Sequence, residues 1–386
     1  MDLCFDEDQE AYRAAVRQFA DEVLTPIARE KYDFRHPLSR KDMQEIAADV
    51  AKYEIATVTP TTPDGSIDLI YLAIFVEEIS RIDFGFASLA NAMFFQVWDM
   101  GSLLRTEEQQ RRYGFMFGRG EMTAIALSEP EAASNPADMR TKARKVENGW
   151  LINGRKLWTS HATVASGILA AAKKETEGED SGWISLFMVE PDTEGLQITP
   201  IETIGMNATS VCELTFTDVF LPDAADLTPG EGGLRAALHL VEQARIKMVF
   251  MAVGVAQAAL DLAVNYAKQR TQFGRPIASF QLVQEMLAEM STLTETSRLL
   301  GYRACSLMMR GYPARAEVSR AKAYSTEAAV RACSLGIQVH GAMGLTKEVL
   351  AEKLFRDARM LTIPDGTTEI HKLVIGRQLT GISAFK

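Results

Sequence analysis

Apolar residues recur at helical spacing over the first third of the chain, residues 6–118. Near the start they stand mostly three and four positions apart, which places them on one face of a helix; they are Ala11, Ala14, Ala15, Phe19, Ala20, Val23 and Leu24. The stretch 67–92 is more uniformly apolar, as expected of a helix that is buried on most sides. Residues 59–66 carry two prolines and a glycine, which predicts a loop between helices.

The pattern changes near Met122 and stays different to about Asp223. Short apolar runs suited to strands replace the helical spacing; they span residues 124–127, 150–152, 183–189 and 212–216. Turn signals of the hairpin kind stand between them, at residues 147–149, 153–154 and 192–195. The charged stretch 173–180 is expected to be an exposed loop. Residues 121–228 are therefore predicted to form a β-domain, a small barrel or sandwich.

Residues 229–233, Pro-Gly-Glu-Gly-Gly, predict a flexible hinge, after which helical spacing returns to about Gly381. The helix that follows, expected to open at Arg245, has a face of small residues suited to close packing; its members are Ala252, Val255, Ala256, Ala259, Leu260 and Ala263. The predicted fold is α+β: a helical domain over 1–120, the β-domain, and a second helical domain over 229–386.

Composition narrows the class of protein. Apolar residues make up 47% of the 386 and no segment is of low complexity, so an ordered globular chain is expected. The formal charge of −10 argues against a nucleic-acid surface, which needs a basic face. The four cysteines lack paired spacing, which predicts reduced thiols in a cytoplasmic protein and neither disulfides nor a metal site. We find no signal segment and no apolar run of about 20 residues, and expect no membrane insertion.

A carboxylate near the C-terminus stands between two residues that break helices, in the sequence Pro364-Asp365-Gly366. A tight turn is therefore predicted around Asp365, although an Asp-Gly pair is usually turn chemistry alone. Two upstream blocks change the interpretation: Arg270-Thr271-Gln272-Phe273-Gly274 and Ala126-Leu127-Ser128-Glu129-Pro130. In this order and spacing, the three blocks resemble the acyl-CoA dehydrogenase family of flavoproteins.

The resemblance implies a fold and a reaction. The outer helical parts would form one framework around the β-domain, with a four-helix bundle in the C-terminal part and FAD as cofactor. In the family, the carboxylate before the Gly-Thr pair is the base that removes the substrate's α-proton; it is ordinarily a glutamate, and here it is Asp365. The base position of some other relatives falls on Ala244, which cannot serve. Arg245 and Gly366 would lie at the acyl-CoA substrate.

The family chemistry assigns two tasks to Asp365. Its carboxylate would take the α-proton as general base, and burial would raise its pKa towards the working pH. Its backbone amide, together with a flavin ribityl hydroxyl, would donate hydrogen bonds to the thioester oxygen as negative charge develops there. The flavin N5 would take the β-hydride.

The resemblance also assigns residues to the flavin. The backbone at Leu127 and Ser128 would hold the pyrimidine ring, with Trp158 over the flavin and Ser160 at its N5 side; Thr367 and Glu369, after the base, are further cofactor contacts. Ser134 would contact the cofactor or CoA. It lies in Glu131-Ala132-Ala133-Ser134-Asn135, where the family often has Gly-x-Gly-Ser-Asp, so the loop shape and the CoA contacts are open.

A second set of residues would reach the FAD of a neighbouring subunit. Arg270 and Gln272 would bind the diphosphate and Phe273 would pack on the cofactor, because a guanidinium offers a planar fork of donors to phosphate oxygens. Gln338 and Gly341 match the family loop that contacts adenosine diphosphate across the same interface. The resemblance thus implies a homotetramer, with electron-transfer flavoprotein as the electron acceptor.

The substrate is expected to be bulky at its α-carbon. Aspartate is one methylene shorter than glutamate, and Pro364 replaces an aromatic residue often found before the base, which would open the acyl pocket. Both changes suit a short, alicyclic or branched acyl group, as in cyclohexanecarboxyl-CoA-type dehydrogenases, with Phe95 and Gln96 on the far wall. Two alternatives stay open: a non-CoA or carrier-protein-bound substrate, and a non-catalytic flavin-binding subunit.

Overall fold

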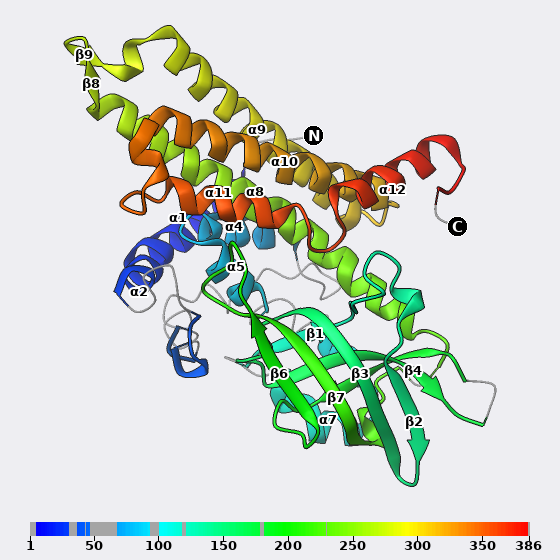
Figure 1. The fold of residues 1–386 in the computed structure, drawn as a ribbon. Helices are drawn as coiled ribbons and strands as arrows, with labels where there is room; N and C mark the ends of the chain where they lie inside the picture. The colour runs from blue at the N-terminus through cyan, green and yellow to red at the C-terminus, as the bar shows by residue number, and fades with distance from the viewer. Residues whose placement is uncertain are drawn as a thin grey trace.

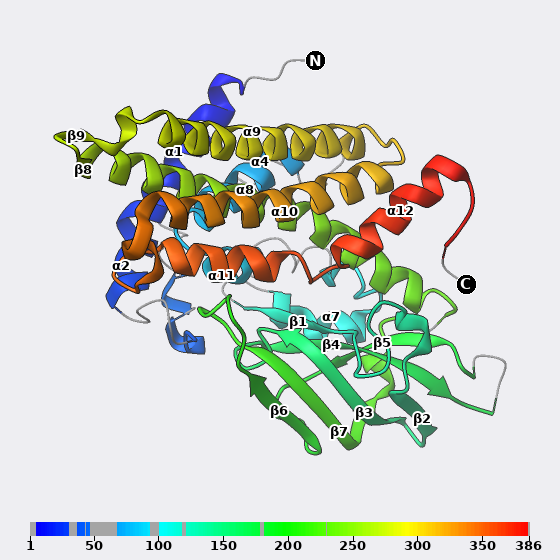
Figure 2. The ribbon, with the colours of Figure 1, turned by 45° about the horizontal axis from the view of Figure 1, so that its top comes forward.

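The computed structural model describes residues 5–30, 37–42, 44–46, 68–92, 100–117, 121–177, 181–228 and 230–384. Helices form the N-terminal and C-terminal parts, and a strand-rich domain lies to one side of them (Figure 1 and Figure 2). The predicted α+β class and the helical–β–helical order are confirmed.

The N-terminal helices begin where a side-chain oxygen caps a free backbone N–H. Asp6 accepts a hydrogen bond from Gln9 N at 2.8 Å, and Asp83 accepts one from Phe86 N at 2.9 Å. The break before Asp83 divides the apolar stretch 67–92, predicted as one helix, into two. The helices are α1 (Glu7–Phe19), a π-helical turn (Ala20–Leu24), α2 (Thr25–Glu30), α4 (Leu69–Ser80), α5 (Phe84–Asn91) and α7 (Glu107–Tyr113). The loop predicted over 59–66 lies outside the described residues.

The middle domain is one seven-stranded mixed sheet in the order β1-β4-β2-β3-β7-β6, with β5 pairing with β4. The strands are β1 (Thr123–Ala126), β2 (Lys142–Val146), β3 (Gly149–Ser160), β4 (Gly167–Glu175), β5 (Ile184–Val189), β6 (Leu196–Ile201) and β7 (Val211–Pro222). Tyr113 at the end of α7 is buried in the same apolar cluster as Ile152 and Phe187 of the sheet. The β-domain therefore has a core of its own, separate from that of the bundle.

Two local predictions in this domain were wrong. Residues 153–154 do not form a turn but lie inside β3, where Gly154 has φ +149° and the register with β7 shifts, as in a β-bulge. Residues 173–175, predicted as part of an exposed loop, belong to β4, and Lys174 forms a buried ion pair with Asp226 at 2.7 Å. The turn predicted at 147–149 does form, with Asn148 at φ +60° between β2 and β3.

The C-terminal part is a bundle of long helices, with α8 to α11 side by side in both ribbon views (Figure 1 and Figure 2). Its elements are α8 (Gly233–Gln269), the short hairpin of β8 (Thr271–Gln272) and β9 (Arg275–Pro276), α9 (Gln281–Met309), α10 (Arg315–His340), α11 (Ala351–Leu361) and α12 (Thr368–Thr380). Because α8 already begins at Gly233, Arg245 lies well inside this helix, and the expectation that it opens the helix was wrong.

Helix α8 joins the two helical parts. Gly254 lies against α4, where a Cβ would approach Glu77 O to 2.3 Å, and the predicted face of small residues is buried in one core shared with the N-terminal helices. Among the described helices, α8 alone is long and apolar enough to cross a membrane, but 61% of that stretch is buried inside the fold. This burial is typical of a core helix.

The loop between β6 and β7 fixes the β-domain on α11. Met206 N donates to Asp357 Oδ1 at 3.0 Å, and Gly205 lies so close that a Cβ would approach the same oxygen to 2.7 Å. Lys353, which is buried, forms ion pairs with both Asp83 and Asp357. These contacts hold α11, and hence the turn that follows it, at a fixed place against the β-domain.

Candidate active site

The turn around Asp365 connects α11 to α12 on the side of the bundle that faces the β-domain (Figure 2). Asp365 has φ +56° and Gly366 has φ +103°. The left-handed region costs an L-residue other than glycine roughly 1–2 kcal/mol, so surrounding contacts must hold Asp365 there. Thr367 caps the following helix by accepting a hydrogen bond from Ile370 N. The turn is therefore a constrained feature at a place where the sequence predicts a base.

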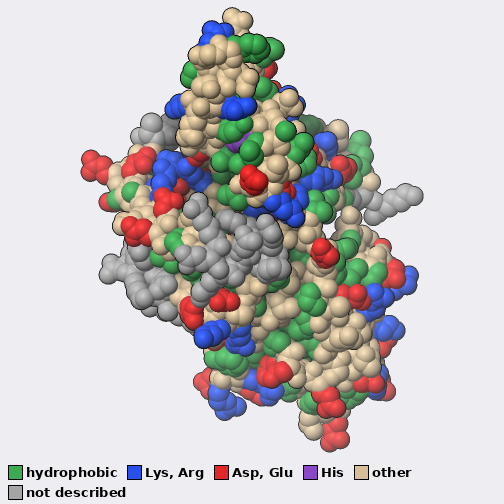
Figure 3. Space-filling view, turned by 60° about the vertical axis from the view of Figure 1, so that its left-hand side comes forward, with side chains coloured by type: hydrophobic (Ala, Val, Ile, Leu, Met, Phe, Trp, Pro, Cys, Tyr) green, Lys and Arg blue, Asp and Glu red, His purple; other side chains and the backbone are tan. Residues whose placement is uncertain are grey.

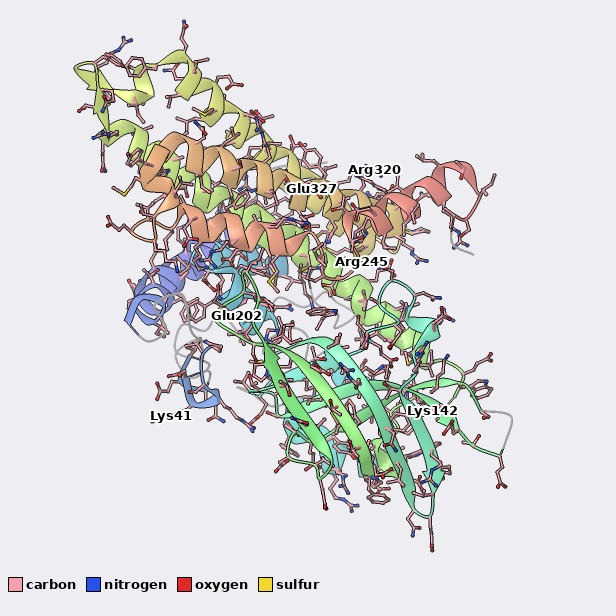
Figure 4. The ribbon with its side chains drawn as sticks, in the orientation of Figure 1. Lys41, Lys142, Glu202, Arg245, Arg320 and Glu327 are labelled. Carbon is pink, nitrogen blue, oxygen red and sulfur yellow. The ribbon has the colours of Figure 1, made fainter. Side chains whose placement is uncertain are left out.

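Two buried cations from different helices hold the carbonyls of this turn. Arg245 Nε on α8 donates to Asp365 O at 2.9 Å, and Figure 4 labels this arginine beside the turn. Lys322 Nζ on α10 donates to Gly366 O at 2.7 Å and to Thr362 O at 3.2 Å. No described residue accepts a hydrogen bond from the backbone amide of Asp365. The arrangement fixes the turn and leaves this N–H free for a ligand.

The surroundings of the Asp365 carboxyl suit a base. Burial raises its pKa above the ordinary value, and the positive charges of Lys322, Arg245 and Lys247 act in the opposite direction. The side chain itself is partly exposed, as a group that must meet a substrate has to be. A buried carboxylate with a raised pKa is a stronger base than an exposed one, which suits the removal of a proton from carbon.

His371 lies beneath the turn. It is fully buried, neither ring nitrogen has a hydrogen-bond partner among the described residues, and a Cβ on Gly366 would stand 3.2 Å from its Nε2. Burial, together with the charges of Lys322 and Arg245, lowers its pKa to about 3. His371 is therefore neutral at physiological pH and adds no charge next to the base.

The two segments predicted to hold the flavin ring lie side by side. Leu157 N donates to Ser128 O at 2.9 Å, and buried Lys156 donates from Nζ to Leu127 O at 3.1 Å. The same Lys156 Nζ pairs with Glu129 at 2.7 Å, and this carboxylate also accepts hydrogen bonds from two backbone amides. The end of β1 is thus locked onto β3 by a buried ion pair.

Trp158 lies at an irregularity in strand β3. It has φ +64°, and the register between β3 and β7 shifts between Lys156 and Thr159. Trp158 is 56% exposed, an unusual state for a tryptophan near the end of an interior strand. Ser160, two residues on, is partly buried and pairs with Val211. An exposed indole beside two ordered backbone segments can receive a flat aromatic ligand.

The remaining predicted residues near this side of the molecule are less constrained. Ser134 is exposed in its loop, Glu369 is exposed on the first turn of α12, and Thr367 is occupied in capping that helix. Phe95 and Gln96 lie outside the described residues.

The residues predicted to bind a neighbour's FAD gather at the opposite end of the bundle. Arg270 is the C-cap of α8, and Gln272 and Phe273 follow in the β8–β9 hairpin; all three are exposed, Phe273 to 92%. Exposed Gln338 and Gly341 close α10 at the same end, where Tyr266 stacks on His340 at 4.4 Å. Figure 3 turns this end of the bundle towards the viewer and shows basic and apolar side chains together at the top of the molecule. Twenty-five residues of α8 separate Arg245 from Arg270, about 38 Å at the helical rise.

Four functional candidates were missed in the sequence: Lys156, Glu129 as its partner, Lys322 and His371. Lys322 shares a helix face with the small residues Ser319, Ser325 and Thr326, three or four positions away, and a lysine in such a face is a weak sign of a buried cation. His371 carries no comparable sign, because a lone histidine four residues into a helix is common.

Comparison with known proteins assigns most of the chain to one family. Family models for the acyl-CoA dehydrogenase N-terminal, middle and C-terminal domains match residues 6–121, 124–219 and 231–380. A 2-methylacyl-CoA dehydrogenase of Solanum tuberosum is 31% identical over 387 residues, which covers 98% of this chain and 92% of that protein.

Two solved structures are similar in fold. A glutaryl-CoA dehydrogenase of Mycobacterium smegmatis in complex with FADH2 superposes with a TM-score of 0.87 at 26% identity, over 99% of this chain and 97% of that one. The prolyl acyl carrier protein oxidase AnaB superposes with a TM-score of 0.84 at 27% identity, over 98% and 100%. The chain therefore belongs to the acyl-CoA dehydrogenase family of FAD-dependent oxidoreductases.

Proposed function

We propose that this enzyme introduces an α,β double bond into a short acyl-CoA whose acyl group is alicyclic or branched at the α-carbon, such as cyclohexane-1-carboxyl-CoA. The observation that carries the proposal is Asp365, a carboxylate with a raised pKa on a strained turn held by two cations. It stands at the position where the family places its base, with a side chain one methylene shorter than usual.

The reaction needs two contributions from the chain and one from the cofactor. Asp365 accepts the α-proton of the thioester on its carboxylate. The backbone N–H of Asp365 donates a hydrogen bond to the thioester oxygen, which gains negative charge as the proton leaves. Bound FAD supplies the hydride acceptor for the β-hydrogen. The electron pair of the broken Cα–H bond then completes the double bond between the α- and β-carbons.

The flavin end of FAD would rest on the segments joined through Lys156. Leu127 and Ser128 offer backbone groups, exposed Trp158 offers an aromatic face, and Ser160 offers a hydroxyl. An exposed indole held at a β-bulge is the observation that fits a flat ring at this place. Ser134, Thr367 and Glu369 are proposed as further contacts of cofactor or substrate.

We place the diphosphate and adenosine ends of FAD against a neighbouring subunit. Arg270, Gln272, Phe273, Gln338 and Gly341 share one end of the bundle, and about 38 Å of helix separates that end from Arg245. No single FAD held at Asp365 could reach along that length within one chain. Phe273 packs on Phe280, and Leu282 beside them is also exposed, so this end presents an apolar patch that an assembly would cover. A homotetramer with shared FAD sites satisfies both conditions.

The choice of acyl group in this proposal rests on the short side chain of the base. With aspartate, either the turn moves inward or the substrate's α-carbon lies closer to it, and a ring or branch at that carbon fits a pocket widened at Pro364. The Solanum tuberosum relative, named for 2-methylacyl-CoA, is similar over nearly the whole chain and supports a branched acyl group. Electron-transfer flavoprotein is the proposed acceptor of the electrons, and the cytoplasm the proposed compartment.

The test is anaerobic mixing of the FAD-loaded enzyme with a panel of acyl-CoAs, recording loss of oxidised-flavin absorption. Cyclic and α-branched short thioesters should bleach the flavin, and long straight-chain thioesters should bleach it poorly. Asp365→Asn should still bind FAD and acyl-CoA but should not bleach. Bleaching by Asp365→Asn, or a preference for long straight chains, would overturn the assignment.

A second candidate keeps the chemistry and changes the carrier. Likeness to the prolyl acyl carrier protein oxidase AnaB favours an acyl group tethered to a carrier protein, and the altered loop 131–135 removes the glycines expected beside CoA. The same acyl group presented on CoA and on a carrier protein would decide between them, because the true carrier should give the faster bleaching at equal concentration.

A further inference from the structure

Lys322 is a buried charge with an unusual set of partners. Its side chain has 0% exposure, and among the described residues no carboxylate forms an ion pair with it. Within the described part of the chain, its hydrogen-bond acceptors are two carbonyls of the Asp365 turn, Gly366 O at 2.7 Å and Thr362 O at 3.2 Å. A buried cation without a carboxylate is expensive to maintain, so a stabilising role alone does not explain it.

The two carbonyls lie on either side of Asp365. Arg245 on α8 donates to the carbonyl of Asp365 itself, so cations hold the peptide planes on both sides of Gly366. The peptide that carries the Asp365 N–H lies between the carbonyl of Thr362, held by Lys322, and the carbonyl of Asp365, held by Arg245. Holding the backbone on both sides in this way restricts the direction in which the Asp365 side chain and its N–H point. We propose that Lys322 is a positioning residue for the dehydrogenation: it holds the Asp365 turn in the left-handed conformation that aims both groups at the substrate. This proposal rests on the proposed role of Asp365.

The charge of Lys322 also acts on the base. Among the positive groups near Asp365 it makes the largest contribution in lowering the pKa of that carboxyl against the effect of burial. Burial lowers the pKa of Lys322 itself to about 8, so about nine in ten of these amines are protonated at pH 7. The titratable and charged groups that face Lys322 are Asp365, Arg245, Glu327, Glu369 and His371. Of these, His371 stays neutral.

Lys322→Met removes the charge and keeps the length of the side chain, and Lys372→Met makes the same change at an exposed site on α12 as control. Both FAD-loaded variants would be compared with wild type for acyl-CoA affinity, unfolding midpoint and flavin bleaching between pH 5 and pH 10. In Lys322→Met the bleaching rate should fall about 10- to 100-fold, and its acid limb should move up by about one pH unit. Lys372→Met should match wild type.

A merely structural lysine would give another result: an equal fall in rate at every pH together with a lower unfolding midpoint, and that outcome overturns the proposal. So does a wild-type rate in Lys322→Met. Because this variant could lose FAD, the wild-type profile serves as a second measurement. Its rate should decline above about pH 8 as Lys322 loses its proton, and a rate that holds steady to pH 10 contradicts the proposal. Bleaching by Asp365→Asn would instead overturn the proposed function, whatever Lys322→Met does.

Discussion

The buried pair of Glu129 and Lys156 offers a quantitative test of how the flavin side of the site is held. Lys156→Met leaves Glu129 buried with two backbone amides as its partners and removes the donor to Leu127 O. Removing one partner of a buried ion pair costs about 3–5 kcal/mol of unfolding free energy, because the other charge stays buried and uncompensated. We expect a loss in this range for Lys156→Met.

Glu129→Gln should cost less, about 1–3 kcal/mol. Burial already lowers the pKa of Lys156 to about 8, and Glu129 is the group that acts to raise it. Without Glu129 the pKa of Lys156 in the folded state falls further. Lys156 then loses its proton near neutral pH, so no unpaired charge stays buried. Since an unfolded lysine holds its proton to about pH 10.4, the stability of Glu129→Gln should rise relative to wild type between pH 7 and pH 9.

Urea unfolding of the FAD-loaded proteins, followed by circular dichroism, measures these differences, and FAD titration of the apoproteins measures the flavin contact. Lys156→Met should bind FAD more weakly, because the end of β1 loses its anchor on β3. Lys142→Met, at an exposed ion pair on the outer edge of the β-domain (Figure 4), is the matched control and should change stability by less than about 1 kcal/mol. The double variant should cost less than the sum of the single ones. Additive costs, or a single-variant cost near that of the control, would refute the reasoning.

Two further outcomes follow from buried groups. His371 has a pKa of about 3 in the fold and about 6.5 when unfolded, so its contribution to stability is complete above pH 6.5 and is lost as the pH falls; by pH 5 the loss is about 2 kcal/mol. Urea unfolding at pH 7.5 and pH 5 should show a smaller drop for His371→Gln than for wild type, and equal drops would contradict this. Gly205→Ala would place a Cβ against Asp357 and should cost about 1–3 kcal/mol, visible as a lower thermal midpoint, whereas Gly230→Ala, with open space around it and no left-handed backbone, is the matched control. Equal thermal midpoints for the two variants would contradict a close contact between the β6–β7 loop and α11.

The sequence predicted those features that local chemistry determines. The order of helical and strand-rich parts follows from hydrophobic periodicity over long segments, and the turn at Asp365 follows from its neighbours Pro364 and Gly366. At residues 153–154 the same turn signal misled, because only pairing with β7, about 60 residues on, makes them a bulge within a long strand. A local pattern does not distinguish these two outcomes.

The residues that hold the site in place could not be predicted from local sequence patterns, for the same reason. Lys322 donates to a carbonyl 44 residues away, and Arg245 to one 120 residues away. A lysine in a helix is usually exposed, so its burial depends on where the turn before α12 packs. Lys156 is similar: nothing within β3 indicates that its amine lies between Leu127 and Glu129.

The length of α8 has a consequence for genetics as well as for assembly. With Asp365 near one end of the bundle and Arg270 at the other, the proposed sharing of FAD between subunits gives each site its base from one chain and its diphosphate contact from the next. A chain damaged only at Asp365 still carries a sound Arg270, and the reverse holds for a chain damaged only at Arg270. When chains of the two kinds assemble together, some FAD sites receive both defects and others receive neither, and the sites without a defect keep their activity. Two inactive alleles of this gene should therefore complement one another within a single cell.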